Sequence, residues 1–251
     1  IGNPPYSNFG RMNKGDWITR KIEDYKEGLN EKKINIDDDY IKFIRYGQEK
    51  IHNTGFGILA FITNNSYLDG ITHRIMREKL IHEFDEIFIV NLHGNLKNQE
   101  KSPNNMDNDN VFDIQQGVSI GIFIKNKQSV ESAVNYFDLW GSRSEKYNFL
   151  STTNFSDCQW IPIKEIYRQS CLGTFHFFAP ISYDNIDEYC SGWPINKIYI
   201  NQNTGIQTKR DELFIDFDRT NLEEKFFEIS RNCNNLEKLR DKYPINDSPG
   251  W

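Results

Sequence analysis

Two adjacent prolines near the beginning of the chain constrain its fold more than any other feature. The sequence opens with Ile1-Gly2-Asn3-Pro4-Pro5-Tyr6. Proline has a fixed φ and no backbone N–H, so Pro4-Pro5 can continue neither a helix nor a central strand. We therefore expect a rigid turn at this point. Because a strand normally leads into such a turn, we also expect the sequence to be a fragment of a longer polypeptide.

Helical and extended segments alternate after the turn. Apolar residues at helical spacing predict a helix that begins near Tyr40, after an N-cap from residues 37–39, and stops at Gly55. A second helix is predicted over 71–83. Continuous apolar runs are typical of buried strands, and a parallel strand is expected at the first of them. The runs are 58–62, 87–90 and 118–124, and residues 134–140 are expected to pair with the last.

This order is typical of the C-terminal half of a doubly wound, Rossmann-like α/β sheet with an antiparallel edge. Residues 10–38 are expected to form a polar loop with a short helix, and residues 93–110, which lack periodicity, a mobile loop. Near residue 148 short aromatic-rich segments replace the helical pattern, before a further helix expected over 221–241. We expect two domains, 1–148 and 149–251, the second with a mixed α+β fold.

Composition limits the partners. The sequence has no run of 18 apolar residues and no charged leader followed by an apolar one, so we expect a cytoplasmic protein without a membrane partner. Residues 1–150 carry 19 basic and 21 acidic side chains and residues 151–251 carry 11 and 15, so contact with nucleic acid needs a local basic cluster. The four cysteines are widely spaced, which predicts reduced thiols and no metal site.

The turn carries residue types suited to methylating an amine on an aromatic ring. The lone pair of such an amine, for example adenine N6, is delocalised, so the nitrogen is a poor nucleophile. Acceptors for its two hydrogens would localise the lone pair, and the Asn3 side-chain carbonyl and the backbone carbonyl held by the two prolines can serve. Tyr6 can stack on a base taken out of the duplex.

Several segments resemble the γ-order N6-adenine DNA methyltransferases, especially those fused into restriction–modification enzymes of type ISP and type IIG. Gly-Asn-Pro-Pro-Tyr at residues 2–6 matches their catalytic motif, and the other segments that carry the resemblance are 39–43, 57–68 and 111–120. The part after residue 150, including 192–194 and 205–211, is similar to the target-recognition region of type ISP enzymes.

The resemblance implies methylation of adenine N6 in double-stranded DNA within a restriction–modification system. It assigns catalysis to Asn3, Pro4, Pro5 and Tyr6, with the amine bound by Asn3 and the Pro4 carbonyl. It also implies that Tyr6 stacks on one face of the flipped base and that Phe112 meets the other face or edge.

The resemblance further implies S-adenosylmethionine as the cofactor, with Phe43 and Tyr40 near it, and DNA contacts by Lys209 and Arg210. The glycine-rich motif that binds this cofactor precedes the catalytic turn in the family and is absent from this sequence. We therefore expect that the remainder of the same polypeptide is needed as a partner and that the fragment alone is inactive.

Simpler interpretations remain open for most of these residues. Tyr40, Phe43 and Phe112 can be core aromatics, and Lys209-Arg210 can be ordinary surface residues. The polar run 64–66 can face a cleft at the end of a strand or form a turn. For the function, the alternatives are methylation of a glutamine amide in a protein, which uses the same turn, and a DNA-specificity module in which the turn is a relic.

Overall fold

The computed structural model describes residues 1–5, 13–31, 36–98, 100–103, 107–126, 132–163, 175–182, 184–199, 211–232 and 236–243. The chain divides into two compact units, Ile1–Ser191 and Gly192–Trp251, and each is described by itself. The boundary expected at residue 148 is that of a catalytic domain, which the division into compact units does not test. It stays a prediction.

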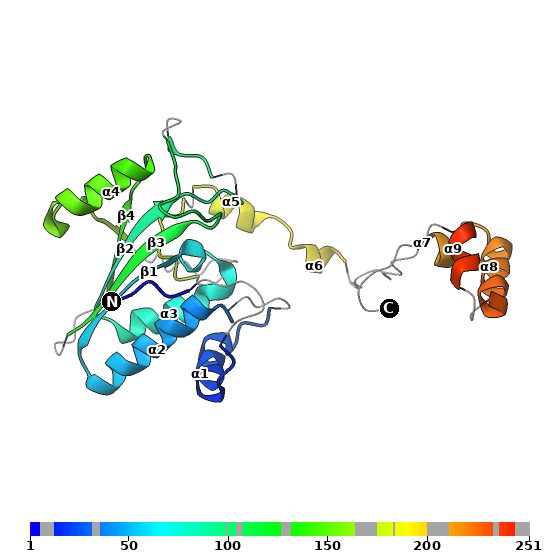
Figure 1. Ribbon diagram of the computed structural model, residues 1–251, viewed down its shortest axis with the longest axis horizontal. Coiled ribbons are helices and arrows are strands. Elements are labelled where there is room, and N and C mark those ends of the chain that lie inside the picture. Colours follow the sequence, from blue (N-terminus) through cyan, green and yellow to red (C-terminus); the bar gives the residue numbers. More distant parts are fainter. Residues whose placement is uncertain are drawn as a thin grey trace. The chain divides into compact units, whose positions relative to one another are not determined.

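A five-stranded mixed sheet forms the centre of the first unit (Figure 1). Its strands are β1 (Gly57–Asn64), β2 (Glu86–His93), β3 (Val118–Lys125), β4 (Ala133–Asp138) and β5 (Ile161–Ile163), in the order β1-β3-β2-β4-β5. β4 runs parallel to β2, and the other neighbouring pairs are antiparallel. The α/β class is thus confirmed for this unit, and strands occupy all four segments in which they were predicted.

The position of β3 corrects the expected strand pairing. β3 lies antiparallel between β1 and β2, so that Ile120 is opposite both Ile62 and Val90. Because both edges of β3 are occupied, β4 pairs with β2 and not with β3. The predicted pairing of 134–140 with 118–124 is therefore wrong. β1 is also antiparallel to β3, and it runs parallel to the chain at Gly2.

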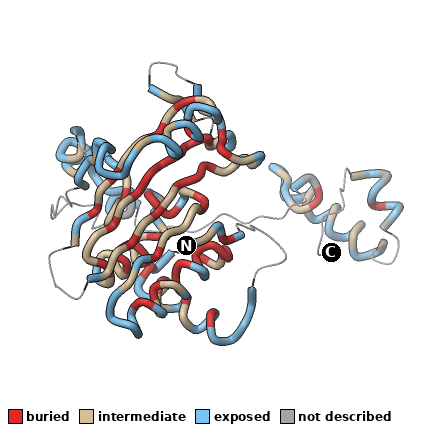
Figure 2. Tube along the Cα trace, turned by 60° about the vertical axis from the view of Figure 1, so that its left-hand side comes forward, coloured by how far each residue is buried: buried red, intermediate tan, exposed pale blue. Residues whose placement is uncertain are grey.

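Two hydrophobic clusters lie on the two faces of the sheet. Side chains alternate along β2: Ile87 and Ile89 join one cluster, and Val90 and Leu92 join the other. The first cluster includes residues of α1 (Asp16–Lys26), α2 (Asp39–Thr54) and α3 (Arg74–Glu83). The second includes Phe149 of α4 (Arg143–Thr152), which lies on the opposite side of the sheet from α2 and α3 in Figure 1. Figure 2 shows the buried residues concentrated along the strands and the inner sides of the helices.

α2 confirms the first predicted helix and its end signals. Asp38 is the N-cap residue, and Gly55 ends the helix with a φ of 77° while its N–H donates to Ile51 O at 2.8 Å. Gly47 faces β1, where a Cβ would lie 2.5 Å from a methyl carbon of Leu59. A glycine at this position therefore lets α2 pack closely on the sheet.

The chain beyond residue 148 still contributes to the first unit. α4 begins with a capping box in which Ser142 and Glu145 satisfy each other's backbone N–H groups. β5 pairs with β4, and the Phe178 N–H donates to Leu68 O at 2.8 Å. α5 (Ile186–Ser191) ends the unit. Cys158 is a free thiol, but Cys190 takes part in a disulfide, so the prediction of a reduced thiol is wrong for Cys190.

The described residues of the second unit form α6 (Ile195–Ile198), α7 (Asp211–Phe214), α8 (Arg219–Asn232) and α9 (Leu236–Lys242). The helix expected over 221–241 is present as α8 and α9. Lys242 Nζ lies 2.6 Å from a carboxylate oxygen of Glu228 and joins the two helices. Within the described parts of the chain, no helix is both long and apolar enough to span a membrane.

Candidate active site

The Asn-Pro-Pro turn lies beside β1. Gly2 forms a parallel bridge with Phe61: the Gly2 N–H donates to Ala60 O at 3.0 Å, and the Ile62 N–H donates to Gly2 O at 3.1 Å. Because the chain runs parallel to β1 here, Asn3 and the prolines follow at the carboxyl end of that strand. Asn3 and Pro5 are exposed and Pro4 is buried, while Tyr6 lies outside the described residues. The expected turn therefore sits where open α/β sheets bind their ligands.

Polar side chains gather where β1 ends. Asn64 Oδ1 accepts from the backbone N–H of Ser66 at 2.8 Å and from its hydroxyl at 2.7 Å. Asn65 turns the other way, toward β2, and its Nδ2 donates to Asn91 Oδ1 at 3.1 Å. The run 64–66 thus forms a hydrogen-bonded turn, and Asn64 and Ser66 also line a pocket. Both interpretations of this run, turn and cleft wall, apply together.

That pocket has a volume of about 160 Å³ and a mainly polar wall, formed by Asp38, Tyr40, Asn64, Ser66, His73, Asn95, Lys97, Asn98 and Gln116. The N-terminal end of α2 meets the carboxyl end of β1 there. His73 is only 5% exposed. Burial, and secondarily the charge of Arg77, lowers the pKa of His73 to about 4, so this wall carries a neutral imidazole near pH 7.

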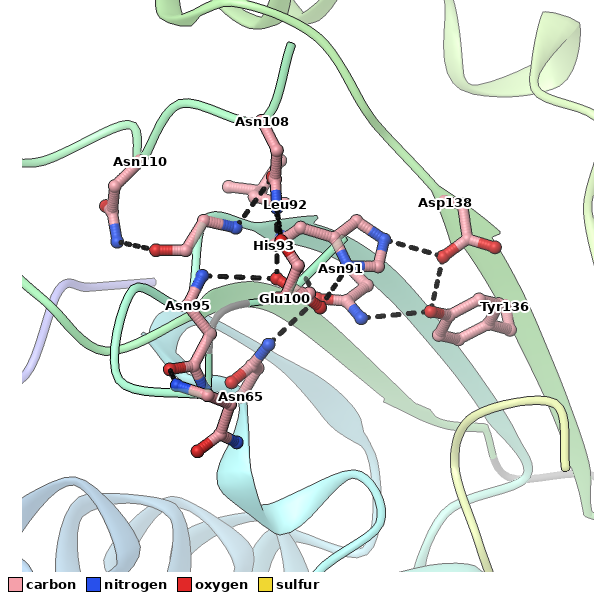
Figure 3. Close-up of polar contacts among 12 residues, drawn as sticks. Asn65, Asn91, Leu92, His93, Asn95, Glu100, Asn108, Asn110, Tyr136 and Asp138 are labelled. Atoms are coloured by element: carbon pink, nitrogen blue, oxygen red, sulfur yellow. Dashed lines mark hydrogen bonds and ion pairs between the residues drawn. The ribbon is translucent and has the colours of Figure 1, made fainter. Parts of the chain in front are cut away.

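A second polar cluster joins the ends of β2 and β4 (Figure 3). His93 lies between two carboxylates, with Nε2 2.7 Å from Asp138 Oδ1 and Nδ1 2.8 Å from Glu100 Oε1. Burial by itself lowers the pKa of His93, but the bonds and charges of these two carboxylates outweigh it, and the pKa is raised above 6.5. His93 also stacks on Trp140, with ring centroids 3.4 Å apart.

Hydrogen bonds connect this cluster to the end of β1. Tyr136 Oη donates to Asp138 Oδ1 at 2.5 Å and accepts from Asn91 Nδ2 at 2.9 Å. Asn91 in turn accepts from Asn65, and Figure 3 shows the continuous path. On the other side, Glu100 Oε2 accepts from the Asn95 N–H at 3.1 Å.

The described residues of the loop 93–110 are held in place. The Gly94 N–H donates to Asn108 Oδ1 at 2.9 Å, and Asn110 Nδ2 donates to the carbonyls of Gly94 and Gln116 at 3.0 and 2.7 Å. In these residues asparagine side chains take the place of a regular backbone hydrogen-bond pattern, and the mobility expected for the loop stays a prediction.

Phe112 follows this loop and is half-buried against the second hydrophobic cluster. Its ring also lines a cavity of about 520 Å³ together with Leu96, Ile114 and Arg143, among others. The structure therefore places Phe112 at a surface hollow as well as against the core.

Tyr40 and Phe43 lie in different surroundings although both belong to α2. Tyr40 is 2% exposed and packs beside Tyr67 with ring centroids 6.3 Å apart, so it is mainly a core residue that also touches the polar pocket. Phe43 is 43% exposed and lines a more apolar hollow of about 340 Å³ with Trp17 and Tyr46. Lys209 and Arg210 lie outside the described residues.

Sequence patterns missed the His93 cluster and the helix α4. The partners of His93 are 7 and 45 residues away, a spacing that matches no metal or triad motif. The signal for α4 was present, since Ser142 and Glu145 have the spacing of a capping box. Among the described residues, no group of three or more His, Cys, Asp or Glu side chains is placed to hold a metal ion.

Comparisons with known proteins find one matching family model and several similar solved structures. Residues 1–98 match the family model of the Eco57I restriction-modification methylase. LlaBIII, an ATP-dependent type ISP restriction-modification enzyme solved bound to DNA, is 28% identical with a TM-score of 0.55, over 64% of this chain and 12% of that chain. No curated protein matches the chain at a significant level.

Two further solved structures share the fold. They are a nuclease-deletion mutant of the type ISP enzyme LlaGI with a DNA substrate mimic (23% identity, TM-score 0.56, 65% of this chain and 17% of that chain) and a DrdV–DNA complex (22% identity, TM-score 0.61, 96% of this chain and 25% of that chain). The chain thus spans at most a quarter of the length of these structures. Residues 1–98 are therefore similar to the Eco57I restriction-modification methylases, and the chain is structurally similar to LlaBIII, a type ISP restriction-modification enzyme.

Proposed function

We propose that this chain is the base-handling part of an S-adenosylmethionine-dependent methyltransferase that modifies adenine N6 in double-stranded DNA, within a cytoplasmic restriction–modification system. One observation carries the proposal: Gly2 pairs in parallel with β1, and Asn3, Pro4 and Pro5 follow at the carboxyl end of the sheet. The similarity to restriction-modification methylases supports the same reaction class.

The chemistry assigned to the turn requires acceptors at fixed positions. Asn3 Oδ1 and the Pro4 carbonyl oxygen each accept one hydrogen of the adenine amine, which localises the nitrogen lone pair and makes it a better nucleophile. Pro5 has no N–H and a fixed φ, and it keeps the Pro4 carbonyl in one orientation. Tyr6 and Phe112 hold the base by stacking or edge contact after it leaves the duplex.

The cofactor supplies an electrophilic methyl group when it is bound. The polar pocket beside the turn offers groups that suit part of it, an acid at Asp38 and an aromatic wall at Tyr40. Its volume of about 160 Å³ is below the range of about 300–1,000 Å³ that is usual for ligand pockets, so the described residues fit a portion of the cofactor. Phe43 opens into the neighbouring apolar hollow and is the second candidate contact.

Target recognition is assigned to residues 149–251, with Lys209 and Arg210 at the phosphates or base edges. Similarity to enzymes solved with DNA supports DNA as the substrate over a glutamine amide. A relic turn in a specificity module would bind DNA without any methyl transfer.

The polypeptide as its gene encodes it is the material for the test. Labelled methyl transfer from S-adenosylmethionine is measured on DNA and on protein acceptors, and the modified nucleoside is identified after digestion. We expect N6-methyladenine. Asn3→Ala should abolish transfer and leave DNA binding intact, and Asn3→Asp serves as the near-isosteric control that keeps an acceptor but changes its charge. Label on a protein amide alone, or DNA binding without transfer to either acceptor, would overturn the proposal.

A further inference from the structure

Four consecutive backbone carbonyls around Phe112 accept hydrogen bonds from side chains of one helix, α4. Lys146 Nζ donates to Asp109 O at 2.6 Å, and Tyr147 Oη donates to Val111 O at 2.6 Å. Arg143 donates to the other two, with Nε 2.8 Å from Asn110 O and Nη2 3.1 Å from Phe112 O. Of these four residues, only Val111 has a buried apolar side chain.

The three donors lie on one face of α4. Arg143, Lys146 and Tyr147 are three and four positions apart, the spacing that brings side chains together on a helix surface. The capping box at Ser142 fixes the beginning of the helix, and the Gly141 N–H donates to Asp107 O at 3.0 Å just before it. The helix therefore holds residues 109–112 from a fixed base.

Lys146 connects the same segment to the sheet. Its side chain is fully buried, and besides Asp109 O its ammonium donates to Leu92 O of β2 at 2.8 Å. Asn108 Oδ1 lies at 3.5 Å. These three acceptors are uncharged oxygens, so the buried ammonium is stabilised by its hydrogen bonds and not by an ion pair. Removing either the ammonium or its carbonyl acceptors would leave a buried polar group without a partner and would cost stability.

The segment is also held from within. The Phe112 N–H donates to Asn110 Oδ1 at 2.9 Å. Asn110 is itself fixed by its bonds to Gly94 O and Gln116 O. Both the N–H and the carbonyl of Phe112 are thus bonded, while its ring is only half-buried and borders the cavity of about 520 Å³.

We propose that Arg143, Lys146 and Tyr147 are positioning residues that hold the Phe112 ring ready to meet the extruded base. The inference rests on the proposed function, because it takes the base contact of Phe112 as its endpoint. A ring whose backbone is already ordered loses little further conformational freedom when the base arrives, and this lowers the free-energy cost of binding. α4 lies beyond the residues that match the family model. The inference therefore assigns a role to a part of the chain outside that match.

Tyr147→Phe is the most selective test, because it removes one oxygen and keeps the ring. In the polypeptide as encoded, kcat and KM for methyl transfer to unmodified DNA are measured for Tyr147→Phe, for Phe112→Ala and for the double variant. Loss of a hydrogen bond to a largely buried carbonyl predicts a decrease of about tenfold in kcat/KM for Tyr147→Phe. In the Phe112→Ala background the same change should have no further effect, because the ring that it positions is gone.

Asp113→Asn is the matched control. It removes a charge from the ion pair with Arg143, in which the Asp113 side chain is 93% exposed, and it should leave kcat/KM unchanged. Arg143→Lys keeps the charge but loses the fork that reaches two carbonyls, so it should behave like Tyr147→Phe.

Two results distinguish failure of this inference from failure of the proposed function on which it rests. If Phe112→Ala keeps full activity, the base contact fails and the positioning role fails with it. If Phe112→Ala lowers kcat/KM but Tyr147→Phe does not, or if the two losses multiply in the double variant, the base contact stands and the role of α4 is overturned. Thermal unfolding of each variant identifies any loss that comes from a failure to fold.

Discussion

His93 Nε2 lies 2.7 Å from Asp138 Oδ1, and this contact joins the carboxyl ends of the neighbouring parallel strands β2 and β4. Glu100 binds the other ring nitrogen, so a single imidazole holds a strand end and the following loop together. The φ of His93 is 54°, a left-handed conformation that few non-glycine residues adopt. The strand therefore ends in a turn whose geometry depends on its side-chain partners.

This contact predicts a pH-dependent stability. The folded-state pKa of His93 is raised above 6.5, so its contribution is fully present below pH 6.5 and is lost as the pH rises through the folded-state pKa. Burial raises the pKa of Glu100, but the hydrogen bond from His93 and its other partners outweigh it and hold the pKa below 4.5. The Glu100 contribution is therefore present above pH 4.5 and is lost as the pH falls through its lowered pKa.

His93→Gln should lower the free energy of unfolding by about 1–2 kcal/mol at pH 6, because two partly exposed carboxylates lose the buried, charged imidazole between them. The free energy of unfolding is measured with urea at pH 6 and pH 9. The difference in this free energy between wild type and variant should be smaller at pH 9. His82→Gln is the control, since His82 is exposed and its loss should change stability by less than about 0.5 kcal/mol. An equal loss for His93→Gln at both pH values would show that its charge does not contribute.

Burial of His73 should make stability depend on pH in the opposite direction. Its pKa in the folded protein is about 4, below the ordinary value of 6.5, because burial disfavours the imidazolium. The unfolded chain therefore binds a proton that the folded chain does not, and stability falls by up to about 3 kcal/mol as the pH decreases from 6.5 to 4. His73→Leu should remove most of this slope. The measurement is urea unfolding across that pH range, and an unchanged slope would show that other groups cause it.

Local pattern predicted the elements of this fold better than their arrangement. The helix at α2 carries its own apolar spacing and its own stop at Gly55, so sequence alone sufficed. β3 offered no such information. Its apolar run is the same whether it pairs with β4 or enters between β1 and β2, because strand order depends on which edges remain free after long-range pairing.

The candidate site divides in the same way. Asn3, Pro4 and Pro5 could be proposed from sequence because the residue types that the chemistry needs lie in one short peptide. The contacts that hold Phe112 come from α4, more than 30 residues further along the chain, and they end on backbone carbonyls that any residue type supplies. A sequence pattern contains no signal for an acceptor of that kind.

Substitution of Arg77 should cause a large loss of stability. Its guanidinium is fully buried and donates to the carbonyls of Tyr67, Gly70, Phe175 and His176 at 2.6–3.2 Å. Arg77→Leu leaves these oxygens without their donor and should lower the free energy of unfolding by about 3–5 kcal/mol. Arg77→Lys should restore little of it, because an ammonium cannot reach all four carbonyls.

Arg20→Leu is the control for Arg77. Arg20 is exposed and makes one side-chain bond within α1, to Asp16 O at 3.3 Å, so its loss should change stability by less than about 0.5 kcal/mol. Denaturant unfolding compares the three variants. Equal stability of Arg77→Leu and Arg20→Leu would mean that water replaces the guanidinium without cost.

Substitution of Gly117 should disturb the hydrogen bonds at the candidate site itself. A Cβ on Gly117 would lie 2.5 Å from Asn65 Nδ2 and 2.6 Å from its Oδ1, so Gly117→Ala must displace the Asn65 amide. Asn65 would then lose its bond to Asn91, which connects the end of β1 to the Tyr136–Asp138–His93 cluster. We expect methyl transfer by the encoded polypeptide to fall about tenfold, the equivalent of about 1.4 kcal/mol.

Asn65→Ala separates displacement from a general packing defect. It removes the amide that a new Cβ would strike, so Gly117→Ala should cost much less in an Asn65→Ala background than in the wild type. Methyl transfer and thermal unfolding are measured for both single variants and the double variant. If the two losses simply add, the close approach between Gly117 and Asn65 is not what Gly117→Ala disturbs, and the path from β1 to His93 does not depend on this glycine.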